Sequence, residues 1–358
     1  MTEREQLSSK PIEELEWYEH MRLRPGMYVR RVDISGFIEM LKGVVNAAIL
    51  GANTDSFTIH FKEDKELSLK FDVLEGRILN NWGQFNRNTI SSFLLELFAL
   101  NALSEKFVIR FLDESEELIH QQIFEKGVLL EGNNLEEISC SMVMIDCLLD
   151  ESIWGTDFAW HHIYLTHQLR EFAYLFAQTK FELNYKVHGD DCKVIYHFKN
   201  GLKDRIDIEL FEGLGGSFFN TVINKKFDDF EIEGAFAFRN YSVDAPYLRS
   251  YTNNYHTHEN GTHVDGLLKG LTYGVMKYFQ KYKLTEEYKI SEKGMQENLV
   301  AAINIKLQNP FYSGCVKNKL ANPDIIEPIA NHVAELLFEM IEQDEKATEQ
   351  LIRKFRVY

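Results

Sequence analysis

Three histidines stand close together in the second half of the chain, and their spacing could serve metal chemistry. His256 and His258 form an H-x-H pair, and His263 follows after a short loop. Imidazole nitrogens at such spacing, with a nearby carboxylate, are ligands that zinc accepts. The same stretch also resembles a loop that opens a helix, because Thr262 is a reasonable N-cap and Asp265 suits the first helical turn. We therefore predict a helix start here and no metal site.

The four cysteines could in principle do redox or metal chemistry. They are Cys140, Cys147, Cys192 and Cys315, and they are scattered along the chain. No metal-ligand spacing and no dense disulfide framework appears, so "SMVMIDCLL" (141–149) is read as a buried strand rather than a reactive site. A reduced, cytoplasmic compartment fits this usage.

The charge of the chain limits which partners it can bind. The formal net charge is −16, whereas binding to the DNA backbone needs clustered lysines and arginines. Basic residues gather only at 315–320 and 352–358, and solvated surface charge is the simpler interpretation of each. DNA contact is therefore possible but not indicated by charge. No apolar run approaches the roughly 18 residues that span a membrane, and the polar N-terminus lacks a signal-peptide core.

The stretch "GFIEMLKGVVNAAILGA" (36–52) predicts a helix with one narrow polar face. Glu39, Lys42 and Asn46 fall at i, i+3 and i+7 and therefore share that face. Apolar residues cover most of the rest of the helix. The polar face holds little that could do chemistry.

The elements that must position these residues alternate between helices and consecutive strands. We predict helices at 13–23, 36–52, 89–103, 164–178, 201–211, 262–282 and from 325 to the end. Strands are predicted at 57–61, 67–73, 107–112, 117–124, 141–147, 181–187, 192–198, 227–239, 246–252 and 299–307, with a turn at Gly26 and a loop at 80–88. Runs of strands favour an α+β fold over a doubly wound parallel sheet. The linker "EGLGGS" (212–217) predicts two domains, 1–212 and 213–358.

Four stretches carry a resemblance to a known family, and they follow one another in its order. They are "RLRPGMY" (22–28), "NALSEKFVIRF…IHQQIFEKG" (101–127), "YTNNYHTHENGTHVDGLLKGLT" (251–272) and "ENLVAAINIKLQNPFYSGCVKNKL" (297–320). Together they resemble the ATPase–transducer region of type IIA topoisomerases, the DNA gyrase B subunit and its topoisomerase IV counterpart. The resemblance implies a Bergerat-type (GHKL) ATPase-like α/β sandwich with an N-terminal arm, then a ribosomal-protein-S5-domain-2-like transducer domain. The family's DNA-cleaving tyrosine lies outside the region covered.

The family's first nucleotide motif is lost in this chain. In the family, one helix carries a glutamate that activates water and, four residues later, an asparagine that binds magnesium. Alignment places Gly43 and Ala47 at these two positions. Glu39 lies one turn too early, and Asn46 is one position away, so its side chain points about 100° off. We therefore predict no catalytic residue and no metal ligand.

The other nucleotide motifs survive only in part. Glu75 and Gly76 stand where an aspartate and a glycine bind adenine in the family, although a plain hairpin turn explains them equally well. The glycine-rich lid that should follow is absent. Lys317 matches the transducer lysine that approaches the γ-phosphate, but Cys315 replaces the glutamine before it. The vestigial nucleotide pocket is thus Asn46, Glu75, Gly76 and Lys317, and ATP and magnesium are implied by the resemblance alone.

The sequence therefore predicts a degenerate gyrase-B-like protein without ATP hydrolysis. Its role would be that of a dimeric structural or regulatory module, with the N-terminal arm (1–13) and the first domain joining two copies and with an unknown protein partner. Ala47 and Leu50 would partly fill the old pocket. One alternative is a split ATPase subunit of a type II topoisomerase whose cleavage modules lie on another chain. Another is a binding module for a different small molecule, which requires an open cavity near Asn46 and Glu75.

Overall fold

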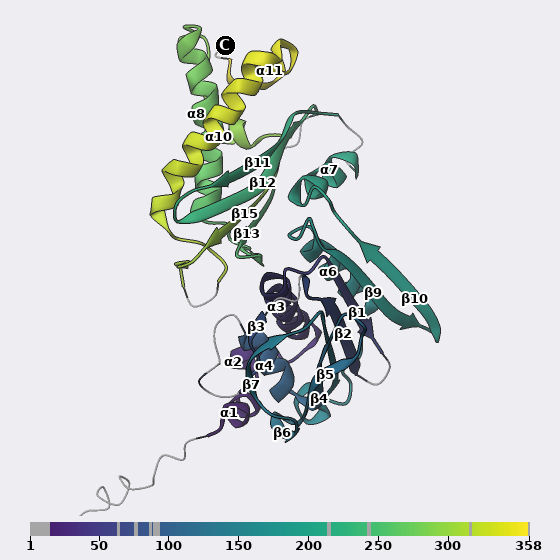
Figure 1. Cartoon of the computed structure of the whole chain (residues 1–358). Helices are drawn as coiled ribbons and strands as arrows, with labels where there is room; N and C mark the ends of the chain where they lie inside the picture. The colour runs from purple at the N-terminus through teal and green to yellow at the C-terminus, as the bar shows by residue number, and fades with distance from the viewer. Residues whose placement is uncertain are drawn as a thin grey trace, which may run out of the picture. The chain divides into compact units, whose positions relative to one another are not determined.

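A computed structural model of the chain describes residues 15–62, 65–74, 78–85, 88, 94–212, 216–241, 245–314 and 317–356. The chain forms two compact units (Figure 1). The first unit comprises the residues up to Arg170 together with Gln178–His197, and the second comprises Glu171–Ala177 and the residues from Phe198 onward. The predicted α+β class is confirmed, since each unit combines helices with a mixed sheet.

An eight-stranded sheet forms the centre of the first unit, in the order β10-β9-β1-β2-β8-β4-β5-β6. Its strands are β1 Ser56–Phe61, β2 Glu66–Asp72, β4 Ser104–Leu112, β5 Leu118–Glu125, β6 Val128–Glu131, β8 Met142–Leu149, β9 Lys180–Val187 and β10 Asp190–Tyr196. Burial alternates along β1, β2 and β8, so one face of the sheet is apolar and covered. Neighbouring strands run antiparallel, except that β1 and β9 are parallel.

The helices of the first unit supply much of its core. They are α1 Trp17–Leu23, α2 Gly26–Val29, α3 Ile34–Ala52, α4 Leu95–Ala102, α5 Glu151–Trp154 and α6 His162–Ala173, whose last residues count with the second unit. Helix α3 begins where the Asp33 carboxylate accepts hydrogen bonds from the backbone N–H of Ser35 and Gly36. It ends at Asn53, which adopts the left-handed conformation. Most residues of α3 are buried.

Helix α3 also corrects the expectation that no segment is apolar enough to span a membrane. Ile34–Ala52 has 19 residues and a mean hydropathy of 1.4, which meets the criterion by length and composition, alone among the helices that the structure describes. Its apolar residues pack inside the first unit and its polar face is half-buried. The helix is therefore a core element, and its apolar character reflects burial on nearly all sides.

Several predictions for the first unit are wrong in detail. Gly26 begins the short helix α2 instead of forming a simple turn. The predicted loop 80–88 contains most of strand β3 (Ile78–Gly83), which pairs antiparallel with β7 (Leu135–Ser139). A strand forms here instead of the predicted loop because the Trp82 side chain is almost fully buried against the ring of Phe71. The short strands β6 and β7 lack a clear apolar alternation and were not predicted.

The second unit is a five-stranded sheet in the order β11-β12-β15-β13-β14. Its strands are β11 Ser217–Lys226, β12 Phe230–Arg239, β13 Tyr247–Thr252, β14 Tyr255–His256 and β15 Leu299–Leu307. Its helices are α7 Leu202–Glu212, α8 Thr262–Lys281, α9 Glu292–Gln296, α10 Ile326–Gln343 and α11 Glu345–Ile352, with 3-10 turns at Pro323–Ile325 and Arg353–Phe355. Helices α8 and α10 pack on one another and on one face of the sheet, where they form the core. Helix α7 contacts β12 and β15.

Two elements of the second unit differ from the prediction. Strand β11 was missed, because it starts at the last residue of the predicted linker and its sequence carries few buried side chains. The predicted strand 227–239 begins only at Phe230. The long terminal helix is broken at Asp344, whose carboxylate accepts a hydrogen bond from the Ala347 N–H and starts α11.

Candidate functional site

The polar face of α3 is tied to its surroundings within the first unit. Glu39, Lys42 and Asn46 are all half-buried, as the predicted narrow polar face requires. The Lys42 ammonium lies 3.0 Å from a Glu39 carboxylate oxygen and donates to the Gln168 side chain of α6 at 2.9 Å. These contacts hold the face in place as part of the helix packing.

The most informative contact of the site joins α3 to α4 at Gly43. A Cβ placed on Gly43 would lie 2.3 Å from Cγ, 2.7 Å from Cδ and 2.9 Å from Cβ of Glu96. The Glu96 side chain therefore occupies the volume into which any side chain at position 43 would extend. The carboxyl carbon of Glu96, which belongs to a different helix, thus lies beside the position where the resemblance places a glutamate.

The apolar residues Ala47 and Leu50, which were predicted to fill the old pocket, differ in their exposure to solvent. Ala47 is 1% exposed, so the position of the family's magnesium ligand is sealed by packing. Leu50 is 50% exposed, and the prediction that it fills a pocket is wrong because its side chain points to solvent. At positions 43 and 47 neither residue offers an oxygen ligand, so these positions do not fit a magnesium ion.

The segment that should carry adenine and phosphate contacts is described in part. Glu75 and Gly76 lie outside the described residues, as does most of the stretch between Phe85 and Leu94. Phe85 is buried among the rings of Trp17, Phe98 and Phe124. Through Phe85 the described end of this segment is anchored in the core.

Lys317 belongs to the second unit, whereas Asn46 belongs to the first. Its side chain is exposed, and its ammonium lies 5.4 Å from the ring centre of Tyr255. Cys315 lies outside the described residues. Of the predicted site residues that the structure describes, Asn46 therefore lies on α3 of the first unit and Lys317 in the second unit.

The histidine-rich loop opens a helix, as predicted, but by a different cap. Gly261, with φ of 139°, is the N-cap of α8, and Thr262 is its first residue. A side chain at Gly261 would strike the backbone of Leu320 at 2.3 Å, so the loop geometry and not a hydroxyl cap sets the start. Asp265 lies in the first turn, as predicted. Burial lowers the pKa of His263 to about 3, and its ring approaches the Thr257 hydroxyl at 3.3 Å.

Two cysteines of the first unit, Cys140 and Cys147, are structural. Cys140 and Cys147 are buried, and burial raises their pKa values to about 11 and about 12. Such thiols stay protonated and unreactive near neutral pH. The prediction of a buried strand at 141–149 is confirmed by β8.

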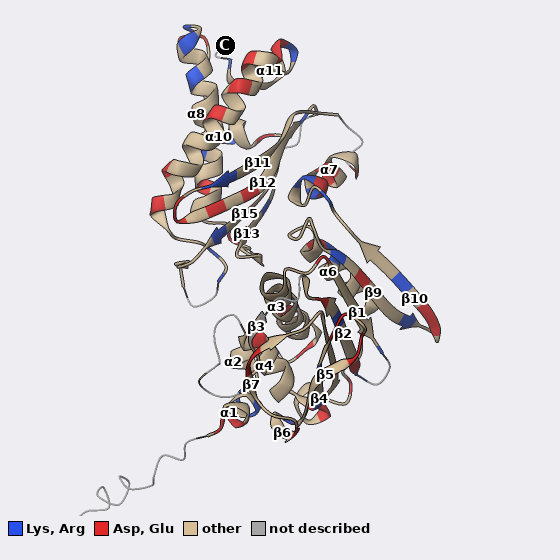
Figure 2. Ribbon diagram, in the orientation of Figure 1, with Lys and Arg blue, Asp and Glu red and all other residues tan. Residues whose placement is uncertain are grey.

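The C-terminal basic segment is not simply solvated charge. Burial lowers the pKa of Lys354 to about 8, and its ammonium donates to the Glu297 carbonyl at 3.0 Å. The ammonium also lies 4.9 Å from the ring centre of Phe238. Lys354 therefore serves packing within the second unit. Figure 2 shows basic and acidic residues interspersed along the elements of both units.

Sequence reasoning missed Glu96. The signal was present, because Glu96 is a single charge inside the apolar run "FLLELFAL" (93–100). Helical periodicity alone, however, does not say which residue of another helix it meets. Only the packing of α3 against α4 pairs Glu96 with a glycine at position 43.

Comparison with known proteins gives a consistent result at the level of sequence. A family model described as DNA gyrase B matches residues 201–357. The B subunit of the type 2 topoisomerase of Aquifex aeolicus is 26% identical over 98% of this chain and 47% of its own length. The B subunit of DNA topoisomerase 4 of Borreliella burgdorferi is 25% identical over 94% of this chain and 55% of its own length. The chain thus spans about half the length of the curated relatives that it matches.

Solved structures support the same fold. The 43K ATPase domain of Thermus thermophilus gyrase B, solved with an aminocoumarin, superposes with a TM-score of 0.77 at 20% identity, covering 95% of this chain and 94% of that chain. The gyrase B subunit of Myxococcus xanthus gives 0.76 at 16% identity, covering 94% and 99%. At such identity these structures establish the fold alone.

Proposed function

Because this chain is a gyrase-B-like ATPase–transducer region, we propose that it is a non-catalytic, dimeric structural or regulatory module that does not hydrolyse ATP. The observation that carries the proposal is the contact of Glu96 with Gly43. A second carboxylate cannot enter there unless Glu96 moves.

The loss of function follows from several changes that act on one reaction. Hydrolysis needs a base for the attacking water and a cation that neutralises the phosphates. Gly43 and Ala47 supply neither, and Ala47 is sealed by packing. Loss of a general base alone typically lowers the rate by roughly 10²–10⁴-fold. Lys317, one exposed cation, does not offset these losses.

The first test is calorimetric titration of the full chain with a non-hydrolysable ATP analogue and magnesium. We expect no binding up to about millimolar ligand, the weak end of ordinary affinities. The matched variant is Asn46→Ala, which removes one polar side chain of the vestigial pocket without touching Gly43. Micromolar binding that this variant abolishes would contradict the proposal.

The dimer belongs to the same proposal and has its own test. We expect a constitutive dimer in sedimentation at micromolar concentration, without nucleotide, and a monomer after deletion of residues 1–13. A monomeric full chain contradicts this part of the proposal. The protein would act in the cytoplasm with a protein partner that remains to be identified.

A split ATPase subunit of a type II topoisomerase is the second candidate, and Glu96 also favours it. The Glu96 carboxylate lies beside the position of the lost base, so it could replace that base from α4. This candidate predicts magnesium-dependent ATP turnover that Glu96→Gln abolishes while binding is retained. Absence of turnover in the unmodified chain eliminates it.

A further inference from the structure

Two large apolar side chains and two arginines are exposed close together in the first unit, at the end of α1 and around α2. Leu23 is 67% exposed and Met27 is 65% exposed, so neither belongs to the core. Arg24 follows α1, Arg30 follows α2, and both are exposed. A tight turn joins the two helices, since the Met27 N–H donates to the Arg24 carbonyl at 3.0 Å. We call Leu23, Arg24, Met27 and Arg30 the arginine surface.

The two arginines of this surface are not neutralised by the part of the chain that the structure describes. Neither Arg24 nor Arg30 makes a hydrogen bond or an ion pair there, whereas the neighbouring Arg31 pairs with Asp33 at 2.7 Å. The nearest acidic residues along the chain, Glu19 and Asp33, are engaged elsewhere. Glu19 accepts a hydrogen bond from the backbone at the start of α1, and Asp33 also caps α3. A chain of net charge −16 thus presents two uncompensated positive charges.

The backbone holds Arg30 in a conformation that glycine adopts more readily than any other residue. Its φ is 60° and its ψ is −48°, and the Arg31 N–H donates to the Val29 carbonyl at 2.6 Å, which closes a γ-turn around Arg30. Such turns with positive φ are rare and strained. Within the described residues the Arg30 side chain makes no hydrogen bond or ion pair that would offset this cost. Strained residues of this kind concentrate at binding sites.

Packing against α3 fixes this turn. A Cβ on Gly36 would overlap the Arg31 carbonyl oxygen and would lie 2.5 Å from that of Val29, so only glycine lets α3 approach the turn so closely. Val29 is buried, and the Tyr28 hydroxyl forms a hydrogen bond of 2.6 Å with the His20 ring. The backbone of the arginine surface is thus ordered before a partner arrives, which lowers the entropic cost of binding.

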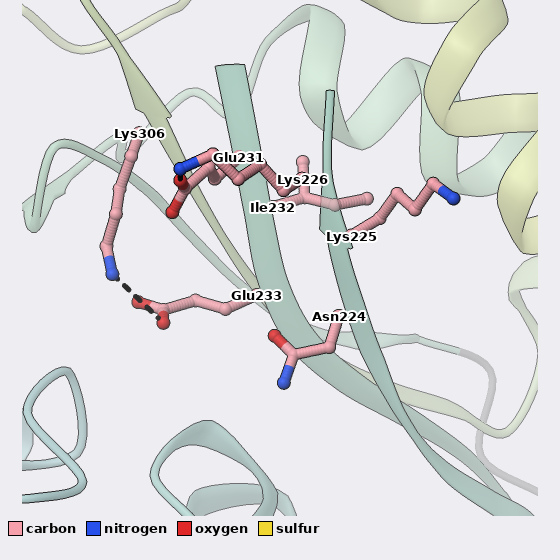
Figure 3. A pocket seen from close by; sticks show the side chains of 7 residues that line it. All are labelled: Asn224, Lys225, Lys226, Glu231, Ile232, Glu233 and Lys306. Atoms are coloured by element: carbon pink, nitrogen blue, oxygen red, sulfur yellow. Dashed lines mark hydrogen bonds and ion pairs between the residues drawn. The ribbon is translucent and has the colours of Figure 1, made fainter. Parts of the chain in front are cut away.

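A cavity of about 320 Å³ on the sheet of the second unit shows the contrasting case (Figure 3). There Lys226 pairs with Glu231 at 2.5 Å, and Lys306 pairs with Glu233 at 3.2 Å. Figure 3 shows Lys225 pointing away from Lys306. The lysines that face this cavity are matched by its own carboxylates, and none of the large apolar side chains exposed in the described residues lines it. It lacks both features of the arginine surface.

The composition of the arginine surface favours a protein partner over nucleic acid. Arginine and methionine are enriched in protein–protein interfaces, and arginine is frequent among the residues that dominate their binding energy. Binding to DNA depends instead on several clustered cations that contact phosphates. Here Met27 stands between only two free charges, and Leu23 stands beside them. The complementary surface therefore has carboxylates next to apolar side chains.

We propose that the arginine surface binds an acidic segment of another protein, in which carboxylates flank large apolar side chains. The carboxylates pair with Arg24 and Arg30, and the apolar side chains cover Leu23 and Met27. This proposal gives a chemistry to the protein partner of the module proposed above and rests on that function. Its test involves neither nucleotide nor dimer formation, so the two proposals can fail separately.

Selection of short peptides from a random phage-displayed library on the full chain tests the proposal. We expect the selected peptides to be enriched in Asp and Glu beside Leu, Met or aromatic residues, and a selected peptide to bind in solution more weakly as salt is added. Arg24→Gln and Arg30→Gly should each weaken this binding about two- to fivefold, and together about tenfold. The matched control is Arg353→Gln, an exposed arginine of the second unit, which should leave binding unchanged.

The variant Arg30→Gly separates binding from folding. Glycine relieves the strained backbone, so we expect a melting temperature about 2–4 °C higher together with weaker binding of the peptide. Met27→Ser removes part of the apolar contact and should weaken binding about tenfold. Its side chain is exposed, so the fold should be retained, and circular dichroism checks this.

Four results would overturn the proposal. Two are a selection without acidic enrichment and equal binding of the selected peptide by the double variant Arg24→Gln/Arg30→Gly. A third is selection that succeeds only after residues 1–13 are deleted, since the chain's own arm would then cover the surface. The fourth is a different occupant: a double variant that turns from dimer to monomer in sedimentation assigns the surface to a second copy, and duplex DNA bound by the unmodified chain alone assigns it to nucleic acid.

Discussion

Gly43 and Glu96 show how much of the site the type of a single residue predicts. The glycine was visible in the sequence as the place of a missing glutamate, and that inference required no structure. The packing of Glu96 into the vacated volume required the structure, because the approach of two helices depends on the whole unit. The residue types of the site could therefore be predicted from the sequence, but the contact between Gly43 and Glu96 could not.

Substitution of Gly43 by alanine tests this packing directly. The added methyl group would overlap the Glu96 side chain, so we expect the free energy of unfolding to fall by about 1–3 kcal/mol. In a Glu96→Ala background the same substitution should be less costly, because most of the obstructing side chain is gone. Urea unfolding of the four proteins measures the coupling. Equal costs in the two backgrounds would show that Glu96 does not fill this space.

Lys354 gives a residue-scale prediction about pH. Its folded pKa, about 8, lies below the ordinary value of 10.5. The protonated form is therefore disfavoured by folding, and this penalty is present below pH 8 and disappears as the pH rises towards 10.5. Lys354→Met removes the charge, so its stability relative to the unmodified chain should be greatest near pH 7 and should decline by pH 10. Thermal unfolding at both pH values checks this; a pH-independent difference contradicts it.

At the scale of elements, helices α8 and α10 approach closely because of a regular series of glycines. Gly266, Gly270 and Gly274 recur every four residues along α8, on the side that faces α10. A Cβ on Gly270 would lie 2.6 Å from the Ala330 carbonyl oxygen and 2.7 Å from the Val333 Cβ. Backbone atoms cannot yield as a flexible side chain can. The interhelical distance thus depends on these positions having no side chain.

We expect Gly270→Ala to destabilise the second unit by about 1–3 kcal/mol, although alanine favours helices more than glycine does. The control is Met276→Ala, at a position on the same helix whose side chain is 41% exposed. Chemical denaturation of both variants gives the comparison. A neutral or stabilising Gly270→Ala would mean that the helices can separate slightly at no cost.

The elements also show why some strands were predictable. Strands β9 and β10 were predicted at 181–187 and 192–198, and β10 begins two residues earlier than predicted. His188 and Gly189, which separate the two strands, both adopt positive φ, as a two-residue hairpin turn requires. Strand β11 has exposed asparagine and lysine side chains and a register shift between Phe218 and Thr221. Its place in the sheet is determined by its partner β12 and not by its own pattern.

At the scale of the whole molecule, carboxylates that accept several hydrogen bonds contribute to the response to acid. Burial tends to raise the pKa of Asp150, but hydrogen bonds from Ser152 and Arg22 outweigh it, and the pKa is lowered from its ordinary value of 3.8. The pKa of Asp146 is lowered in the same manner, with Ser68 and Arg110 outweighing burial. A depressed folded pKa stabilises the fold above pH 3.8 and ceases to do so as the pH falls below it.

We therefore expect stability to fall as the pH drops through about 4, and Asp150→Asn to weaken that dependence. The asparagine keeps the shape of the carboxylate but cannot titrate. Thermal unfolding between pH 3 and pH 7 compares the slopes of the two proteins. An unchanged slope would show that Asp150 is not linked to acid unfolding.

The two-domain boundary predicted at residue 212 stays a prediction, and fragments test it. Helix α7 buries Leu202, Ile206 and Leu210, and Arg239 of β12 pairs with Glu209 at 2.7 Å. A fragment from residue 198 should therefore unfold at a higher temperature than one from residue 213. Equal melting temperatures would place the boundary at 212 after all.

The path of the chain between its two units has a consequence for inheritance. The segment Glu171–Ala177 counts with the second unit, yet Gln178–His197 returns to the first before the chain finally leaves it. A single crossover between two genes can join contiguous stretches only. It would therefore separate Glu171 from Arg205, which it contacts at 2.9 Å, or separate β9 from its parallel partner β1. A chimera of two related genes joined at one point would therefore draw the two sides of one of these contacts from different parents.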